Sequence, residues 1–181
     1  MTSSNIGKWS AWYDTLTDPQ PYADTATYQL GAEWLAGCAT VEDWGCGMGW
    51  MRRFVPPERY CGVDGTASPF ADEVVDLATY QSTTDGLFMR HVLEHNRDWR
   101  SVLDNAVASY RERMVLVLFT PMAEATQEIA PFDNVIDVPN IAFRHDDLAE
   151  RFGDASFSFT DLPSGSFYGT ERIYYLERSR G

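Results

Sequence analysis

The hydrophobic pattern alternates between short apolar runs and stretches with helical periodicity. The clearest helix follows Asn96, which is expected to cap it. Its apolar residues recur at spacings of three and four, as on one buried face of a helix: Trp99, Val102, Leu103, Ala106, Val107 and Tyr110. The next run, 114–119, is continuously apolar and is predicted to be a strand covered on both faces.

Earlier in the chain, the pattern predicts one more helix and four shorter strands. Asp24 is expected to cap the helix, which should end near Gly37. Strands are predicted over 39–44, 60–64, 73–77 and 87–89. The link between the second and third strands is too short for a full helix.

The C-terminal part predicts a short helix over 146–152 and two strands, near 155–159 and 173–177, joined by a turn over 162–169. Strands alternating with helices, followed by a terminal β pair, indicate an α/β fold: a Rossmann-like, doubly wound, mostly parallel sheet with a terminal antiparallel strand. In such sheets ligands bind at the carboxyl ends of the strands. The pattern over 121–145 gives no clear element.

With 181 residues, of which 44% are hydrophobic, the chain is expected to form a single domain, 1–181, around one core. Residues 1–37 are expected to form an N-terminal helical lid segment, and residues 38–181 the sheet core. The aromatic side chains Trp9, Trp12, Tyr13 and Tyr22 could cover a site as a lid or pack against the sheet. With no signal sequence and no long apolar run, we expect a cytoplasmic protein that does not enter membranes.

The formal net charge of −13 disfavours nucleic acid as a partner, because phosphate backbones would be repelled at long range. A local basic patch formed by Arg90, Arg97 and Arg100 stays possible. The three cysteines lack zinc-ligand spacing, so we expect reduced thiols and no metal site.

The most informative segment runs from a predicted strand into three glycines at every second position: Asp43, Trp44, Gly45, Cys46, Gly47, Met48, Gly49. Glycine lets the backbone turn sharply and approach a ligand closely, which leaves amide N–H groups free for a carboxylate. A simple tight turn would have the same composition. Asp64 favours the ligand-binding interpretation, because it ends the next strand, where doubly wound folds place an acid for ribose hydroxyls.

This combination resembles the class I S-adenosylmethionine-dependent methyltransferase family, whose first motif is an acidic residue, a variable residue and then Gly-x-Gly-x-Gly. The dinucleotide fingerprint Gly-x-Gly-x-x-Gly fits less well, since position 50 is Trp. The resemblance extends to residues 88–95, which contain the Leu-Glu-His often found in small-molecule methyltransferases, and it covers about residues 39 to 120.

The resemblance implies S-adenosylmethionine as cofactor and assigns the binding residues. Asp43, Gly45, Cys46, Gly47 and Gly49 would hold the methionine part, Asp64 with Gly65 the ribose, and Asp76 with Leu77 the adenine edge; Arg90 and His91 would lie near the methyl group. Three features depart from the family pattern. Glu42 is charged within the first strand, Pro56 and Pro57 stop the next helix early, and the second crossover helix is nearly absent.

His91 and His95 are the candidate catalytic residues, because imidazole can accept a proton near neutral pH and both follow the fourth strand. Both could instead be structural, and His95 could simply bond to the backbone. His145 is expected to be an exposed residue at a helix start, and Asp133 lies in a segment without a predicted element. Nucleophile-elbow and phosphate-loop motifs are missing from the sequence, which argues against hydrolases and P-loop enzymes.

The sequence therefore predicts a methyltransferase acting on a small molecule, such as a sugar or another metabolite. Two alternatives stay open: a protein or nucleic-acid methyltransferase, and a catalytically idle cofactor-binding domain that serves as a partner subunit. The oligomeric state is not predicted.

Overall fold

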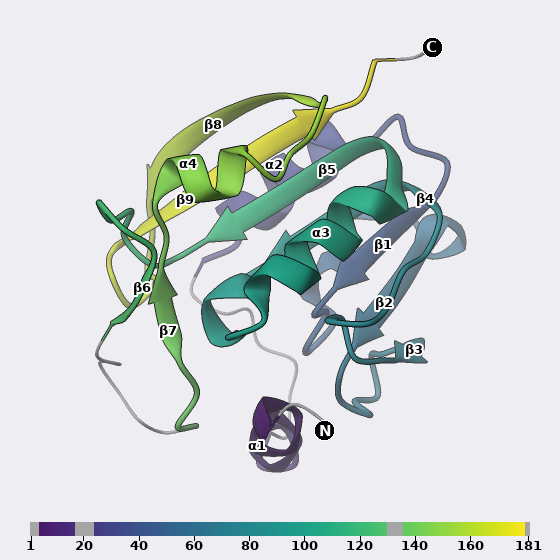
Figure 1. The fold of residues 1–181 in the computed structure, drawn as a ribbon. Helices are drawn as coiled ribbons and strands as arrows, with labels where there is room; N and C mark the ends of the chain where they lie inside the picture. Colours follow the sequence, from purple (N-terminus) through teal and green to yellow (C-terminus); the bar gives the residue numbers. More distant parts are fainter. Residues whose placement is uncertain (1–3, 17–23, 130–135, 180–181) are drawn as a thin grey trace.

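The computed structural model describes residues 4–16, 24–129 and 136–179. Its main sheet has seven strands in the order β3-β2-β1-β4-β5-β9-β8 (Figure 1). The strands are β1 (Val41–Trp44), β2 (Tyr60–Asp64), β3 (Glu73–Val74), β4 (Thr84–Arg90), β5 (Tyr110–Leu118), β8 (Ser156–Pro163) and β9 (Thr170–Glu177). The first five pair in parallel, whereas β9 runs antiparallel to both β5 and β8. The structure thus confirms the α/β sheet with a terminal antiparallel strand.

Helices cover both faces of this sheet, and the alternation of side chains along each strand explains why. Leu87 and Met89 of β4 pack with α3 (Trp99–Ser109) and α4 (His145–Ala149), while Phe88 points to the opposite face. That face is covered by α2 (Ala26–Trp34). The helix can approach the sheet closely because Gly31 has no side chain: a Cβ there would lie 2.4 Å from the Phe88 ring. Both faces are apolar there, so β4 and β5 contain continuously hydrophobic runs, 87–89 and 114–118.

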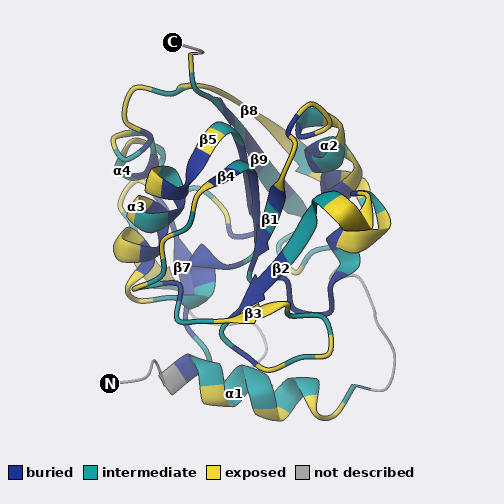
Figure 2. Cartoon of the chain, turned by 90° about the vertical axis from the view of Figure 1, so that its right-hand side faces the viewer, coloured by how far each residue is buried: buried dark blue, intermediate teal, exposed yellow. Residues whose placement is uncertain are grey.

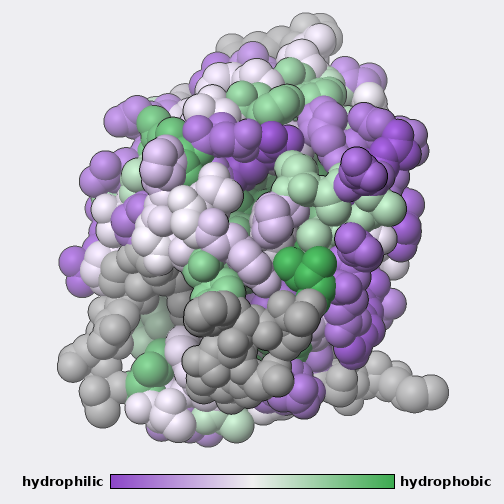
Figure 3. Space-filling model, turned by 90° about the vertical axis from the view of Figure 1, so that its left-hand side faces the viewer, coloured by the Kyte–Doolittle hydropathy of each residue, from purple (hydrophilic) through white to green (hydrophobic). Residues whose placement is uncertain are grey.

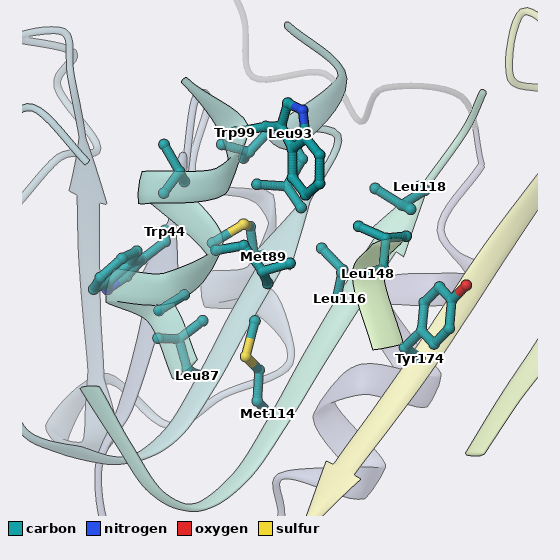
Figure 4. Close-up of a cluster of buried hydrophobic side chains, with 14 of the residues drawn as sticks. Trp44, Leu87, Met89, Leu93, Trp99, Met114, Leu116, Leu118, Leu148 and Tyr174 are labelled. Carbon is teal, nitrogen blue, oxygen red and sulfur yellow. The ribbon is translucent and has the colours of Figure 1, made fainter. Parts of the chain in front are cut away.

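The larger core lies between the sheet and the pair α3 and α4. Figure 4 shows side chains from β4, β5 and β9 converging with those of the two helices. Burial agrees with this arrangement. In Figure 2 the central strands are mostly dark blue, which marks buried residues, and the helices have exposed positions on their outer sides. Among the described residues, the large hydrophobic side chains that are exposed are Val74, Phe157, Phe159 and Phe167. On the face seen in Figure 3, apolar positions are interspersed with hydrophilic ones.

Several element boundaries differ from the sequence prediction. Asn96 does not cap α3: the N-cap is Asp98, and the Asn96 side chain donates to the Val92 carbonyl, within the turn that ends β4. Asp24 accepts the N–H of Ala26, although the N-cap residue of α2 is Thr25.

The third strand shortens to two residues, and no helix lies between β2 and β3. The segment after Pro121, which gave no prediction, contains the two-stranded sheet β6 (Gln127–Ile129) and β7 (Asn140–Ala142).

The charge within β1 has a local explanation. The Glu42 carboxylate accepts hydrogen bonds from the indole N–H of Trp44, at 2.7 Å, and from the hydroxyl of Ser82, at 2.6 Å. A half-buried acid with two donors is tolerated even within a central strand. The short 3-10 helix Trp50–Arg53, followed by Pro56 and Pro57, replaces the first crossover helix of the family pattern.

The N-terminal helix α1 (Ser4–Tyr13) does not pack on a sheet face. It lies across the carboxyl ends of the parallel strands, at the bottom of Figures 1 and 2. Among its described residues, the segment 1–37 therefore forms two helices with different environments: α1 over the strand ends and α2 against the sheet.

Candidate functional site

The main pocket lies at the carboxyl ends of β1, β2 and β4 and is lined on one side by α1. The strand order reverses between β1 and β4, because the chain builds β2 and β3 on one side of β1 and β4 and β5 on the other. Doubly wound sheets bind ligands at this switch point. The fold thus places the pocket where the sequence analysis expected a ligand.

The glycine loop after β1 adopts a conformation that other residues rarely take. Gly45, Gly47 and Gly49 have φ values of 73°, 51° and 65°, all in the left-handed region that favours glycine. Packing adds a second requirement, because a Cβ on Gly45 would lie 2.3 Å from a methyl carbon of Val92 and one on Gly49 would lie 2.7 Å from Cβ of Phe70. Two of the three glycines are therefore required by neighbouring protein atoms as well as by backbone conformation.

Asp64, at the end of β2, ties this loop to the following turn. Its Oδ2 accepts the backbone N–H of Gly47 at 2.8 Å, and its Oδ1 accepts the backbone N–H and the hydroxyl of Thr66 at 2.9 and 2.8 Å. The carboxylate is buried and lines the pocket. Oδ2 keeps one lone pair for a further donor.

Asp43, at the third position of β1, is a second buried carboxyl group at the pocket wall. It accepts a 2.7 Å hydrogen bond from the Tyr60 hydroxyl. Burial raises its pKa to about 7, and the negative charge of Asp64 adds to this effect. Near neutral pH both the protonated and the ionised form of Asp43 are therefore populated, and a cation in the pocket would favour the ionised form.

Arg90, at the end of β4, belongs to a buried network. Its guanidinium donates to Glu171 at 2.7 Å, to Thr27 at 2.9 Å and to the hydroxyl of Tyr28 at 3.2 Å. The Arg90–Glu171 ion pair is almost completely buried, with exposed side-chain fractions of 2% and 0%. Burial raises the pKa of Tyr28 to about 12, so this phenol stays protonated. The network joins α2, β4 and β9 at the pocket wall.

His91 follows Arg90 with a backbone φ of 58°, a left-handed conformation that is costly for a side chain with a Cβ. Its ring lies against Phe119, with centroids 4.8 Å apart. Burial and the charge of Arg90 lower the pKa of His91 to about 4, so the imidazole is neutral at pH 7. The residue lines the pocket.

His95 ends the short 3-10 helix Leu93–His95 and also lines the pocket. Its Nδ1 lies 3.0 Å from the carbonyl oxygen of Pro139. A carbonyl only accepts hydrogen bonds, so Nδ1 carries the proton and Nε2 is the bare nitrogen. Burial lowers the pKa of His95 to about 4, which keeps this imidazole neutral as well.

Glu94, between Val92 and His95 in the Leu-Glu-His segment, points into the protein. Its Oε1 accepts the backbone N–H of Phe119 at 2.7 Å, and burial raises its pKa to about 8. Glu94 therefore secures the end of β5 and does not line the pocket.

Four side chains of α1 complete the pocket: Asn5, Ile6, Trp9 and Tyr13. The amide of Asn5 donates to the main-chain oxygen of His95 at 2.6 Å, and the rings of Trp9 and His95 meet edge to face at 5.2 Å. Lys8 bonds to Asp137 and anchors the outer side of the helix. Of the aromatic residues expected there, Trp9 and Tyr13 line the pocket and Trp12 does not. Tyr22, like Asp133, lies outside the described residues.

The structure brings ten of the twelve residues expected at the site to one pocket: Asp43, Gly45, Cys46, Asp64, Gly65, Asp76, Leu77, Arg90, His91 and His95. Gly47 and Gly49 shape the loop without lining the pocket. No sequence signal identifies Tyr28 or Glu171 as part of the site, because each looks like an ordinary residue of a helix or strand. The helical spacing of apolar residues in α2 identifies Tyr28 only as part of the buried face of that helix.

Other expected features fall outside this pocket. The three arginines form no basic patch, since Arg90 is buried, Arg97 pairs with Glu128 and Arg100 stacks on Trp99. His145 is half-buried, with Nδ1 2.9 Å from the Tyr174 hydroxyl.

Within the described ranges, no group of three or more potential metal-ligating side chains lies together. The cysteines Cys38, Cys46 and Cys61 are free thiols. None of the helices described is both long and apolar enough to cross a bilayer.

Comparison by sequence gives no result: no family model and no curated protein matches the chain. Comparison by structure gives many. The 1,6-didemethyltoxoflavin-N1-methyltransferase of Burkholderia thailandensis has a TM-score of 0.66 at 17% identity, over 87% of this chain and 80% of that one. The N-methyltransferase NodS of Bradyrhizobium japonicum has a TM-score of 0.66 at 12% identity, over 98% and 100%.

A third neighbour, the magnesium protoporphyrin IX methyltransferase ChlM of Synechocystis PCC 6803, has a TM-score of 0.60 at 16% identity, over 98% of this chain and 96% of that one. All three of these structures contain S-adenosylhomocysteine. At these identities the likeness concerns the fold. The strand order, the antiparallel β9 and these neighbours together establish that the chain has the fold of the class I S-adenosylmethionine-dependent methyltransferases.

Proposed function

We propose that this protein binds S-adenosylmethionine in the main pocket and transfers its methyl group to a small molecule. The observation that carries the proposal is the bond between Gly47 and Asp64. It joins a left-handed glycine turn to a buried acid that lines the pocket at the switch point of the sheet. Bound S-adenosylmethionine would supply an activated methyl group on a positively charged sulfur.

The donor set suits the parts of this cofactor. The free lone pair of Asp64 can accept a ribose hydroxyl, and Asp76 with Leu77 offers a polar and an apolar contact to the adenine edge. The left-handed turn over Gly45 to Gly49 supports the methionine part. Near it, Tyr28 and Arg90 present a phenol and a guanidinium that suit a carboxylate.

The charges around the reacting end also support this assignment. Asp43 provides a carboxyl group that ionises readily beside a cation. Arg90 is neutralised by Glu171, so its positive charge opposes a sulfonium less than a free arginine would. His91 and His95 are neutral at pH 7 and can each accept a proton from an O–H or N–H nucleophile.

We favour a small-molecule acceptor because the net charge of −13 disfavours nucleic acid and the arginines do not form a basic patch. A sugar or a similar metabolite with a protic nucleophile suits the two neutral imidazoles. The protein acceptor and the idle partner subunit are the competing functions, and the assay below separates them.

Calorimetry tests the cofactor assignment. We expect S-adenosylmethionine and S-adenosylhomocysteine to bind with micromolar or tighter affinity, and NAD not to bind. Binding of NAD alone would contradict the proposal.

The acceptor is found by incubating the protein with isotope-labelled cofactor and pools of metabolites, proteins or oligonucleotides. Label in a metabolite supports the proposal. Label only in a protein or an oligonucleotide would show that the acceptor is a macromolecule and contradict the proposed small-molecule acceptor. Cofactor binding without transfer to any pool would identify an idle domain.

A further inference from the structure

Glu171 of β9 is a completely buried carboxylate that holds three elements together at the pocket wall. Its Oε2 accepts the hydroxyl of Thr27 at 2.6 Å, and its Oε1 accepts a guanidinium N–H of Arg90 at 2.7 Å. The same Oε1 lies 3.1 Å from Nε2 of His91. Burial alone would raise the pKa of Glu171, but His91, Arg90 and Thr27 together hold it below its usual value. The group is therefore a carboxylate at neutral pH.

The two ring nitrogens of His91 have different surroundings. Nε2 is shut off from solvent and lies next to the carboxylate, although its alignment falls short of a regular hydrogen bond. A bare nitrogen lone pair facing a carboxylate oxygen at this distance would be repelled, whereas an N–H would be attracted. Nδ1 makes no hydrogen bond with a described residue, and the imidazole lines the pocket. The electrostatics therefore favour a proton on Nε2 and a bare Nδ1.

The backbone supports a functional origin of this arrangement. The φ of 58° at His91 is unfavourable for a non-glycine residue, and the strand β4 ends one residue earlier. Such strain persists where the surroundings hold a residue in place, and it clusters at functional sites. The surroundings here are the main-chain bond from the His91 N–H to the Val117 carbonyl, the Phe119 ring and the Glu171 carboxylate.

We propose that Glu171 is the positioning residue of the active site: it holds His91 as the Nε2–H tautomer, so that the bare Nδ1 takes the proton of the acceptor. This inference rests on the proposed function for the acceptor and the methyl group. As the acceptor oxygen or nitrogen bonds to the methyl carbon, its proton moves to Nδ1. The carbon–sulfur bond breaks, and its electron pair stays on sulfur. The carboxylate then faces an imidazolium, whose charge it stabilises.

His95 provides an internal comparison within the same pocket. The Pro139 carbonyl fixes its proton on Nδ1, so His95 should be the opposite tautomer. The chain contains only one further histidine, His145. A single spectrum can therefore report both predicted tautomers.

The test is a two-dimensional nitrogen–proton correlation of the histidine rings in uniformly ¹⁵N-labelled protein near pH 7. We expect His91 to be protonated on Nε2 and His95 on Nδ1, each in a ratio of at least about ten to one. A His91 ring protonated mainly on Nδ1 in the wild-type protein would overturn the inference. This measurement needs neither cofactor nor acceptor.

Glu171→Gln removes the charge with little change in size. We expect the tautomer ratio of His91 to shift at least about tenfold toward Nδ1–H, while His95 does not change. Thr27→Val is the matched control, because it removes the bond to Oε2 and the bond from the Arg90 guanidinium but leaves the carboxylate beside His91. An unchanged His91 ratio in folded Glu171→Gln protein would contradict the positioning role. If this variant fails to fold, the wild-type spectrum decides.

Binding and turnover separate this inference from the proposed function. Glu171 does not line the pocket, but it neutralises Arg90, which we place at the cofactor. The kcat of Glu171→Gln is therefore measured with saturating S-adenosylmethionine, and with the identified acceptor it should fall by about 10- to 100-fold. A wild-type protein that does not bind S-adenosylhomocysteine contradicts the proposed function, whereas the tautomers still test the role of Glu171.

Discussion

The backbone N–H of Gly47 donates a 2.8 Å hydrogen bond to Oδ2 of Asp64, which joins the glycine loop after β1 to the end of β2. The acid therefore has two tasks, since it shapes the loop and offers its remaining lone pair to a ligand. A substitution at Asp64 should affect both the fold and the binding of the cofactor.

We expect Asp64→Asn to lower the affinity for S-adenosylhomocysteine by about 30- to 1000-fold. The amide has one acceptor oxygen, so it cannot serve both Gly47 and Thr66, and an N–H group would face one of their donors. Calorimetry measures the affinity, and urea denaturation should show a loss of about 1 to 3 kcal/mol. Thr66→Val is the control, because it removes only the hydroxyl bond. Affinity within about threefold of wild type in Asp64→Asn would separate the acid from the ribose site.

Two glycines with similar backbone conformations distinguish strain from packing. Gly45 and Gly153 have φ values of 73° and 66°, but a Cβ on Gly45 would lie 2.3 Å from Val92, whereas nothing lies within 4 Å of one on Gly153. We expect Gly153→Ala to lower the free energy of unfolding by about 1 to 2 kcal/mol. Gly45→Ala should lose at least about 1 to 3 kcal/mol more, as measured by urea denaturation. Equal losses in the two variants would mean that Val92 moves away from the new methyl group without a cost in free energy.

Asp43 makes the stability depend on pH in a predictable direction. Its pKa of about 7 in the folded protein lies above the unfolded value of about 3.9. The folded state therefore binds more protons between about pH 4 and 7, and the stabilising contribution is lost as the pH rises through this window. Asp43→Asn keeps an acceptor for Tyr60 and cannot ionise. Between about pH 4 and 7, its free energy of unfolding should therefore fall by up to about 4 kcal/mol less than that of the wild-type protein.

Thermal denaturation of both proteins from pH 4 to pH 8 measures this difference. Glu94, whose pKa is raised to about 8, contributes a loss of the same sign, but it is present in both proteins and cancels in the comparison. Identical pH profiles would show that Asp43 titrates with an ordinary pKa.

Trp9 should report cofactor binding. Its indole lines the pocket and meets the His95 ring, so S-adenosylhomocysteine should change the tryptophan fluorescence. We expect the change to disappear in Trp9→Phe and to persist in Trp12→Phe, because Trp12 does not line the pocket. Trp9→Phe should also weaken binding by about threefold to tenfold, since a smaller ring buries less apolar surface. An undiminished signal in Trp9→Phe would place α1 elsewhere in solution.

The sequence predicted the sheet and most of the pocket because these depend on local patterns. The alternating glycines mark the loop, and the acid after Val63 marks the end of β2. The predictions failed where local signals compete: Asn96 and Asp98 can both cap a helix, and the turn that bonds Asn96 to Val92 gives the cap to Asp98.

Other features depend on contacts between distant segments. Glu171 meets Arg90 across 81 positions of the chain, and neither residue carries a signal for the other. The pair β6 and β7 was missed for a related reason, since each strand has only three residues, too few for a periodic pattern.

The attachment of α1 determines when the pocket can be completed during folding. Asn5 bonds to residue 95, and Lys8 to residue 137, so α1 must wait for partners that are synthesised much later. Closing such long loops is slow compared with local pairing. We expect the sheet to form first and the helix to dock last. The pocket wall that α1 supplies is therefore the last part of the site to be assembled.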